Sequence, residues 1–81
     1  MTRLNGKEMQ RATTAMMIHS IPELLRHIST FTPLEAGDVI VTGTPGGIGW
    51  RRAPPVFLAP GDLVEIEVSS IGTLRNIVAA E

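Results

Sequence analysis

The fold class of this 81-residue chain follows first from Leu63-Val64-Glu65-Ile66-Glu67-Val68, in which apolar and acidic side chains alternate from Val64 onward. Alternate side chains of a strand point to opposite faces, so this pattern predicts a strand with one solvated face. Residues 69–72 are expected to turn the chain, and residues 73–80 to return as the last strand. Together these segments predict a β-hairpin.

A second hairpin is predicted at the opposite end of the sequence. Residues 3–4 and 7–10 flank Asn5-Gly6, the strongest two-residue hairpin signal, because both positions tolerate positive φ. The following residues, 11–17, have no clear hydrophobic period. We expect them to form an extended loop.

One helix is predicted, and it begins at Ser20. Ser20 and Glu23 have the spacing of a capping box, in which the hydroxyl accepts a hydrogen bond from a backbone N–H and the glutamate reaches back. Pro22 lies in the first turn, where its missing N–H costs nothing. Apolar residues between 21 and 31 follow helical spacing, and Pro33 predicts that the helix stops near residue 31.

The centre of the chain combines turns, a short strand and a glycine-rich loop. Residues 34–38 predict a turn, residues 39–41 a short strand covered on both faces, and residues 42–49 the loop. Asp38 and Asp62 each follow a turn glycine, and each is expected to close its turn through an Asx-type hydrogen bond. The order of elements indicates a mixed α+β fold in which strands dominate, with one short helix.

The composition indicates one globular domain at most. Hydrophobic residues make up 43% of the chain and charged residues 19%, with a net charge of −1. This charge excludes a basic nucleic-acid footprint and gives no reason to expect attraction to anionic membranes. The absence of cysteine removes disulfides, Cys-ligated zinc and thiol nucleophiles. With no secretory signal and no apolar run of ~18 residues, a cytoplasmic protein is expected. A domain this small without crosslinks is expected to need a partner or to be part of something larger.

The glycine-rich loop is the most informative segment for function. Four glycines between Gly43 and Gly49 allow backbone N–H groups to approach a ligand closely. The loop is not a phosphate loop, because the Walker pattern needs Gly-Lys-Ser/Thr beginning five residues after Gly43, and the chain has Ile48-Gly49 there. No dinucleotide-binding pattern fits either. Two interpretations stay open, an anion- or carboxylate-binding loop and a plain surface turn.

Ionisable residues elsewhere in the sequence suggest no metal site. His19, Glu23 and His27 have the spacing of ligands on one helix face, but the capping box places His19 before the helix begins. We therefore interpret His27 as an exposed helical residue. Glu65 and Glu67 share one face of a strand, and we interpret that face as solvated. Arg51 and Arg52 border the glycine-rich loop and could meet an acidic ligand, although solvated side chains are the favoured interpretation.

These segments together resemble one family. Residues 34–49, Leu-x-x-Gly-Asp-Val-Ile-Val-Thr-Gly-Thr-Pro-x-Gly-Ile-Gly, are similar to a strand and loop of the fumarylacetoacetate hydrolase family. Matching positions continue upstream between Asn5 and Leu24 and downstream between Pro55 and Asn76, so the resemblance covers essentially the whole sequence. Met16, where many members carry an acidic residue, and residues 51–53 depart from the family pattern.

The resemblance implies the C-terminal portion of the family's mixed β-roll, so that residues 1–81 would be one partial catalytic domain. The family's three carboxylate ligands for magnesium or manganese, its His-Glu dyad and its usual lysine lie upstream of the matching part, and none of those motifs is present in these residues. The resemblance therefore implies Mg²⁺ or Mn²⁺ in the complete domain, with no metal ligand and no catalytic residue in this segment. It also implies a homodimer, or association with the missing part of the domain.

The resemblance implies a substrate-binding role for Thr44 and Gly43. The hydroxyl and backbone of Thr44 would contact a carboxylate or keto oxygen of a small 2-oxo or 1,3-dicarbonyl acid, with Gly43 beside it. The implied enzyme performs C–C hydrolysis, decarboxylation or keto–enol isomerisation. The alternative is a catalytically inactive truncated product or a small structural or interaction module.

Overall fold

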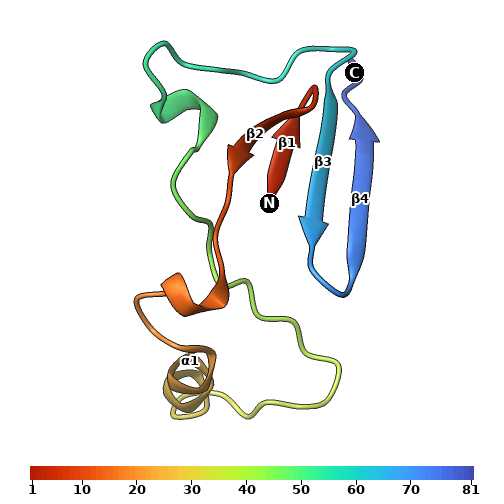
Figure 1. The fold of residues 1–81 in the computed structure, drawn as a ribbon. Helices are drawn as coiled ribbons and strands as arrows, with labels where there is room; N and C mark the ends of the chain where they lie inside the picture. The colour runs from red at the N-terminus through yellow and green to blue at the C-terminus, as the bar shows by residue number, and fades with distance from the viewer. The chain divides into compact units, whose positions relative to one another are not determined.

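The computed structural model describes residues 1–81, which form two compact units. The first unit comprises residues 1–12 and 45–81, and the second comprises residues 13–44. The first unit contains a four-stranded antiparallel sheet with strand order β2-β1-β3-β4 (Figure 1). Its strands are β1 (Thr2–Leu4), β2 (Lys7–Gln10), β3 (Leu63–Val68) and β4 (Gly72–Ile77). With a single α-helix in the second unit, the predicted β-dominated α+β fold is confirmed.

The N-terminal hairpin forms where Asn-Gly predicted it. Asn5 and Gly6 both have positive φ, 51° and 82°, as a tight two-residue turn requires. The Asn5 side chain also ties this turn to β3, because its Oδ1 accepts from the Leu63 N–H at 2.8 Å and its Nδ2 donates to Asp62 Oδ1 at 2.9 Å. One residue therefore shapes the first turn and fixes the start of the central strand.

The C-terminal hairpin is also confirmed. β3 pairs with β4 in a register that places Ile66 opposite Leu74 and Val68 opposite Gly72. β4 ends at Ile77, three residues before the predicted end of the last strand. The N–H of Val78 and the carbonyl of Val78 still bond to residues 61–62, which closes this end of the hairpin.

The helix α1 (Ile21–Ile28) begins as predicted and ends earlier than predicted. Ser20 accepts from the Glu23 N–H at 3.3 Å, so the N-terminal cap is present. At the other end, Ser29 Oγ donates to the Arg26 carbonyl at 2.8 Å and Thr30 Oγ1 donates to the His27 carbonyl at 2.6 Å. These hydroxyls satisfy carbonyls that further helical turns would otherwise use, and the helix stops.

Two loops of the second unit differ from the sequence-based expectation. The segment 11–17, expected to be extended, contains a single 3₁₀ turn at Thr14–Met16. The strand expected at residues 39–41 is absent, and the side chains of Val39 and Val41 are 87% and 91% exposed. A strand needs a neighbour to accept and donate its backbone hydrogen bonds, and no other segment of the chain pairs with these residues.

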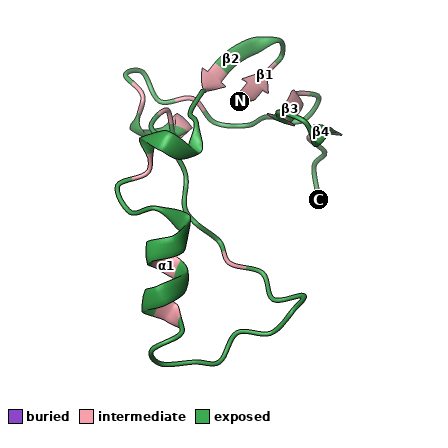
Figure 2. Ribbon diagram, turned by 60° about the horizontal axis from the view of Figure 1, so that its bottom comes forward, coloured by how far each residue is buried: buried purple, intermediate pink, exposed green.

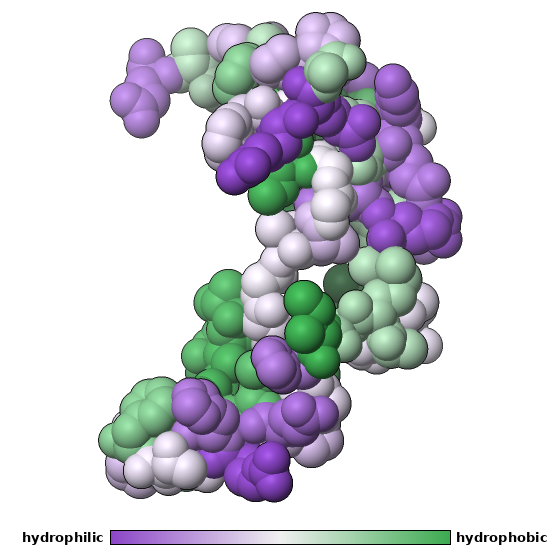
Figure 3. Space-filling view, turned by 90° about the vertical axis from the view of Figure 1, so that its left-hand side faces the viewer, coloured by the Kyte–Doolittle hydropathy of each residue, from purple (hydrophilic) through white to green (hydrophobic).

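No residue of either unit is buried, and Figure 2 accordingly shows only intermediate and exposed residues. On the sheet, Ile66 and Leu74 lie opposite each other on one face, yet they are 43% and 61% exposed. Apolar side chains therefore lie at the surface, as the green areas of Figure 3 show. Turns and strand ladders define the local structure, and a hydrophobic core is not present. No helix is long and apolar enough to cross a membrane.

Candidate functional site

The two residues expected to bind substrate lie in an open part of the glycine-rich loop. Gly43 and Thr44 are both exposed, and they end the second unit. Gly43 has a φ of +97°, which disfavours any residue with a side chain. A Cβ placed on Gly43 would meet no atom within 4 Å, and the same holds for Gly46. A ligand could therefore approach the backbone at Gly43 and at Gly46 without displacing protein atoms.

The other two glycines of the loop, Gly47 and Gly49, lie where the backbone packs closely against another segment of the chain. A Cβ on Gly47 would collide with the carbonyl oxygen of Met9, and a Cβ on Gly49 would collide with the carbonyl oxygen of Val56. The Val56 N–H also donates to the Gly49 carbonyl at 2.8 Å. These glycines allow close approach of the chain to itself. The four glycines thus divide into two that are open to solvent and two that are required by packing.

Arg52 is not a solvated side chain, so the favoured interpretation of this residue is wrong. It is half-buried, its Nη2 donates to the Met9 carbonyl at 2.5 Å, and its Nε donates to the Gly47 carbonyl at 3.3 Å. Carbonyls held against a guanidinium replace the water that a solvated arginine would bind. The neighbouring Arg51 is exposed, with its guanidinium carbon 4.5 Å from the centre of the Trp50 ring. For Arg51 the solvated interpretation agrees with the structure.

Gln10 is a second residue whose contact with the loop the sequence did not indicate. Its Nε2 donates to the Pro45 carbonyl at 3.0 Å. Gln10 lies at the end of β2, 35 residues before Pro45, and no local pattern connects the two. The only signal in the sequence was the crowding of glycines, which marks close backbone approach without naming the partner.

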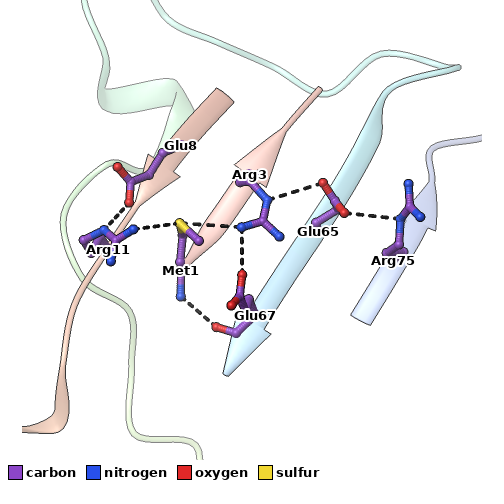
Figure 4. Close-up of polar contacts among 7 residues, drawn as sticks. All are labelled: Met1, Arg3, Glu8, Arg11, Glu65, Glu67 and Arg75. Atoms are coloured by element: carbon purple, nitrogen blue, oxygen red, sulfur yellow. Dashed lines mark hydrogen bonds and ion pairs between the residues drawn. The ribbon is translucent and has the colours of Figure 1, made fainter. Parts of the chain in front are cut away.

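The carboxylates of β3 are engaged by arginines (Figure 4). Arg3 on β1 lies between them, with its Nη1 2.8 Å from Glu67 Oε2 and its Nε 3.4 Å from Glu65 Oε1. Arg75 on β4 adds a contact of 3.2 Å to the other oxygen of Glu65. The Glu65 side chain is only 15% exposed, so this face is less solvated than the alternation predicted. The hydrogen bond from Arg3 lowers the pKa of Glu67, and the same bond raises the pKa of Arg3.

The chain's own residues do not fit a metal centre. No group of three His, Asp or Glu side chains lies close enough together to hold a metal ion. Glu65 and Glu67 already bind cationic side chains, which leaves them poor ligands for a further cation. His19 Nδ1 lies 3.6 Å from Glu23 Oε2, whereas the His27 ring packs edge-on against Phe31 with ring centres 5.7 Å apart. The three residues with ligand-like spacing are therefore not gathered at one point.

Asp38 and Asp62 each close a turn as expected, but the bond is not of the Asx type, because each carboxylate accepts from an N–H three residues earlier instead of two residues later. Asp38 Oδ2 accepts from the Glu35 N–H at 2.8 Å, and Asp62 Oδ2 accepts from the Ala59 N–H at 2.9 Å. The hydrogen bonds from Asn5 and from Ala59 lower the pKa of Asp62, the Asn5 side chain having the larger effect. Both aspartates have structural roles, and neither is free to act as a ligand without opening its turn.

Comparison with known proteins identifies a family model and several relatives that match this chain. The family model described as "Fumarylacetoacetate (FAA) hydrolase C-terminal" matches residues 1–79. The oxaloacetate tautomerase YisK of Bacillus subtilis is 49% identical over 75 residues, which are 93% of this chain and 25% of that protein. The uncharacterized protein SSP1806 of Staphylococcus saprophyticus is 44% identical over 78 residues, which are 96% of this chain and 26% of that protein. The chain thus spans about a quarter of the length of the curated relatives it matches.

Solved structures agree with the fold. A fumarylacetoacetate hydrolase from the psychrophile Exiguobacterium antarcticum superposes with a TM-score of 0.92 at 42% identity, over 99% of this chain and 29% of that one. A probable 2-hydroxyhepta-2,4-diene-1,7-dioate isomerase from Mycobacterium abscessus gives a TM-score of 0.91 at 39% identity, over 99% of this chain and 30% of that one. The local arrangement of strands, helix and loop is therefore the same as in these two proteins.

Proposed function

The chain belongs to the fumarylacetoacetate hydrolase family, and on this premise we propose that it is the C-terminal part of an enzyme acting on a 2-oxo or 1,3-dicarbonyl acid. The names of its relatives support this substrate class, since they describe a fumarylacetoacetate hydrolase, a dienedioate isomerase and an oxaloacetate tautomerase. Each of these substrates is an acid that also carries a carbonyl or enol group. Keto–enol tautomerisation of such an acid is the first reaction to test, because the tautomerase relative is 49% identical to this chain.

We propose that Thr44 and Gly43 hold the substrate. The Thr44 hydroxyl donates to a carboxylate or keto oxygen, and Gly43 leaves room for the ligand beside it. The supporting observation is the open space around Gly43 next to an exposed threonine. A hydrogen bond to one end of the substrate restricts its rotation and holds the reacting carbon in position. Such anchoring serves hydrolysis, decarboxylation and isomerisation equally.

The proposed enzyme uses Mg²⁺ or Mn²⁺, whose ligands we place outside these 81 residues. The residues of this chain do not fit the metal, because the carboxylates of Glu65 and Glu67 are bound by Arg3 and Arg75. We therefore assign no step of the reaction to a metal held by this segment. Its contribution is to bind and orient the substrate.

The test uses a chimaeric enzyme in which these residues replace the matching quarter of the Bacillus subtilis tautomerase. Thr44→Val keeps the β-branched shape and removes the donor. Loss of one hydrogen bond to a charged group costs about 1.5–3 kcal/mol, so kcat/KM for oxaloacetate should fall roughly ten- to a hundredfold. Thr73→Val is the matched control, since Thr73 is exposed on β4 opposite Glu67. Equal losses at the two threonines, or no loss at Thr44, would contradict the substrate role.

We further propose that the remaining part of the same domain, or a second copy of the chain, covers the apolar side chains that are exposed here. The supporting observations are the absence of buried residues and the greater length of the relatives. Exposed apolar surface and free strand edges favour association. The 81-residue chain by itself should therefore self-associate in sedimentation velocity. A monodisperse monomer that unfolds cooperatively would contradict this proposal.

A further inference from the structure

The glycine-rich loop continues, immediately after Thr44, into a segment that is attached to the end of β2. Two side chains make the attachment: Gln10 donates to the Pro45 carbonyl at 3.0 Å, and Arg52 donates to the Gly47 carbonyl at 3.3 Å. The second donor group of Arg52 reaches the Met9 carbonyl at 2.5 Å. Arg52 therefore connects the loop directly to the strand.

The shape of arginine suits this contact. Its planar guanidinium carries several donors in a rigid fork, so two carbonyls can be bound with little loss of side-chain freedom. Here the two carbonyls, on Met9 and Gly47, come from segments far apart in the sequence. A lysine could supply donors from only one point, and an apolar side chain could supply none. The absence of a side chain on Gly47 is part of the same contact, because a Cβ there would collide with the Met9 carbonyl oxygen.

The attachment also orients the peptide groups of the loop. In a planar trans peptide, the N–H points away from the carbonyl of the same peptide group. With the carbonyls of Pro45 and Gly47 turned toward Gln10 and Arg52, the N–H groups of Gly46 and Ile48 are turned to the opposite side. These two contacts restrict rotation of the peptide groups that follow Thr44 in the sequence.

We propose that Arg52 is a positioning residue, which fixes residues 45–49 on β2 and thereby sets the backbone conformation of the part of the glycine-rich loop that follows Thr44 in the sequence. The catalytic consequence rests on the proposed function of Thr44, whereas the structural consequence does not. Arg52 touches backbone carbonyls of the protein, and its effect on the reaction is exerted through the loop.

Two measurements on matched variants test this role. Arg52→Met keeps the aliphatic stem and removes both donors, Arg52→Lys restores donation from one point, and Arg51→Met removes an exposed arginine one residue away. In the chimaeric tautomerase, the ¹⁵N NMR order parameters of residues 46–49 should fall in Arg52→Met, because the carbonyl contacts no longer restrict these peptide groups, and should stay unchanged in β1, β3 and β4. Arg51→Met should leave the order parameters unchanged everywhere.

In the chimaeric tautomerase, Arg52→Met should lower kcat/KM roughly tenfold, within the range expected when a binding group is displaced by about 1 Å. Arg52→Lys should recover part of that loss, and the thermal midpoints of both variants should match that of Arg51→Met.

Three outcomes separate the attachment from the substrate role. Equal order parameters at residues 46–49 in the Arg52→Met and Arg51→Met variants would overturn the proposal, as would lower order parameters across the whole sheet. If order parameters fall only at residues 46–49 and activity is unchanged while Thr44→Val is impaired, preorganisation is overturned and the substrate role of Thr44 stands. A neutral Thr44→Val would instead overturn the substrate role, and the order parameters would then decide the attachment alone.

Discussion

The turns around Asp38 and Asp62 have the same local structure and different continuations. In each, the aspartate carboxylate accepts from the backbone N–H three residues earlier, at 2.8 Å and 2.9 Å, and the preceding glycine has a positive φ, at +96° and +93°. After Asp62 the chain enters β3, which is paired on one side with β1 and on the other with β4. After Asp38 the chain enters residues 39–41, which are all apolar and pair with nothing in this chain.

The two turns differ in their hydrogen bonds to other segments of the chain. Asp62 also accepts from the Asn5 side chain at 2.9 Å, which brings the first hairpin against the start of β3. Asp38 has no such second contact among the hydrogen bonds of its turn. A turn is made by bonds within four residues, whereas a strand requires a second strand. Identical turn chemistry therefore does not produce identical secondary structure.

The largest expected effect on the sheet comes from proline substitutions in the two segments that follow these turns, β3 and residues 39–41. Proline at Ile66, in the middle of β3, removes the N–H that a strand ladder uses, and proline is tolerated in sheets only on edge strands, at strand starts or at bulges. Ile66→Pro should therefore abolish protection from hydrogen exchange in β1 and β4. Ile40→Pro should leave that protection unchanged, because residues 39–41 have no ladder to lose. Loss of protection from both substitutions would show that residue 40 belongs to a paired strand.

A smaller effect should distinguish the two turn glycines. Alanine at Gly37 or at Gly61 meets no steric obstacle, since nothing lies within 4 Å of either added Cβ. The positive φ alone should cost roughly 1–2 kcal/mol in each turn. Gly61→Ala should reduce exchange protection in β3 and β4, because the Gly61 N–H donates to the Val78 carbonyl at 2.8 Å. Gly37→Ala should not alter the sheet, and an equal reduction from both substitutions would contradict the comparison.

The smallest expected effect is the pH dependence of the stability that Asp62 contributes to the fold. Hydrogen bonds from the Asn5 side chain and the Ala59 N–H lower the pKa of Asp62 below its ordinary value of 3.8. Because the folded pKa is depressed, the stability that Asp62 contributes is present above pH 3.8 and is lost as the pH falls through the lower, folded value. Carboxyl NMR titration should give a midpoint below 3.8, and Asn5→Gly, which accepts the positive φ at this position, should raise it. A midpoint at or above 3.8 in the unsubstituted chain would refute the assigned hydrogen bonds.

Features governed by neighbours along the chain were predictable from the residues. The Asn5-Gly6 turn, the capping of α1 by Ser20 and the two aspartate turns all depend on bonds spanning a few residues, and all are present. The alternation in β3 correctly predicted a strand there, and the missing core agrees with the expectation that a domain this small without crosslinks needs a partner or is part of something larger. For the glycine-rich loop, the sequence located the segment and left its role open.

Contacts between distant segments were decided only in the folded chain. Arg52 reaches Met9 across 43 residues, and Arg3 reaches Glu67 across 64, distances over which neither periodicity nor spacing predicts a partner. The same limit explains the strand wrongly expected at residues 39–41, where the side chains suited a strand and the pairing segment was absent. Hydrogen bonds within a turn are set by local torsion angles, so the residues determine them. Strand pairing and the arginine contacts depend on which backbone groups the fold brings together, and that is settled by tertiary structure.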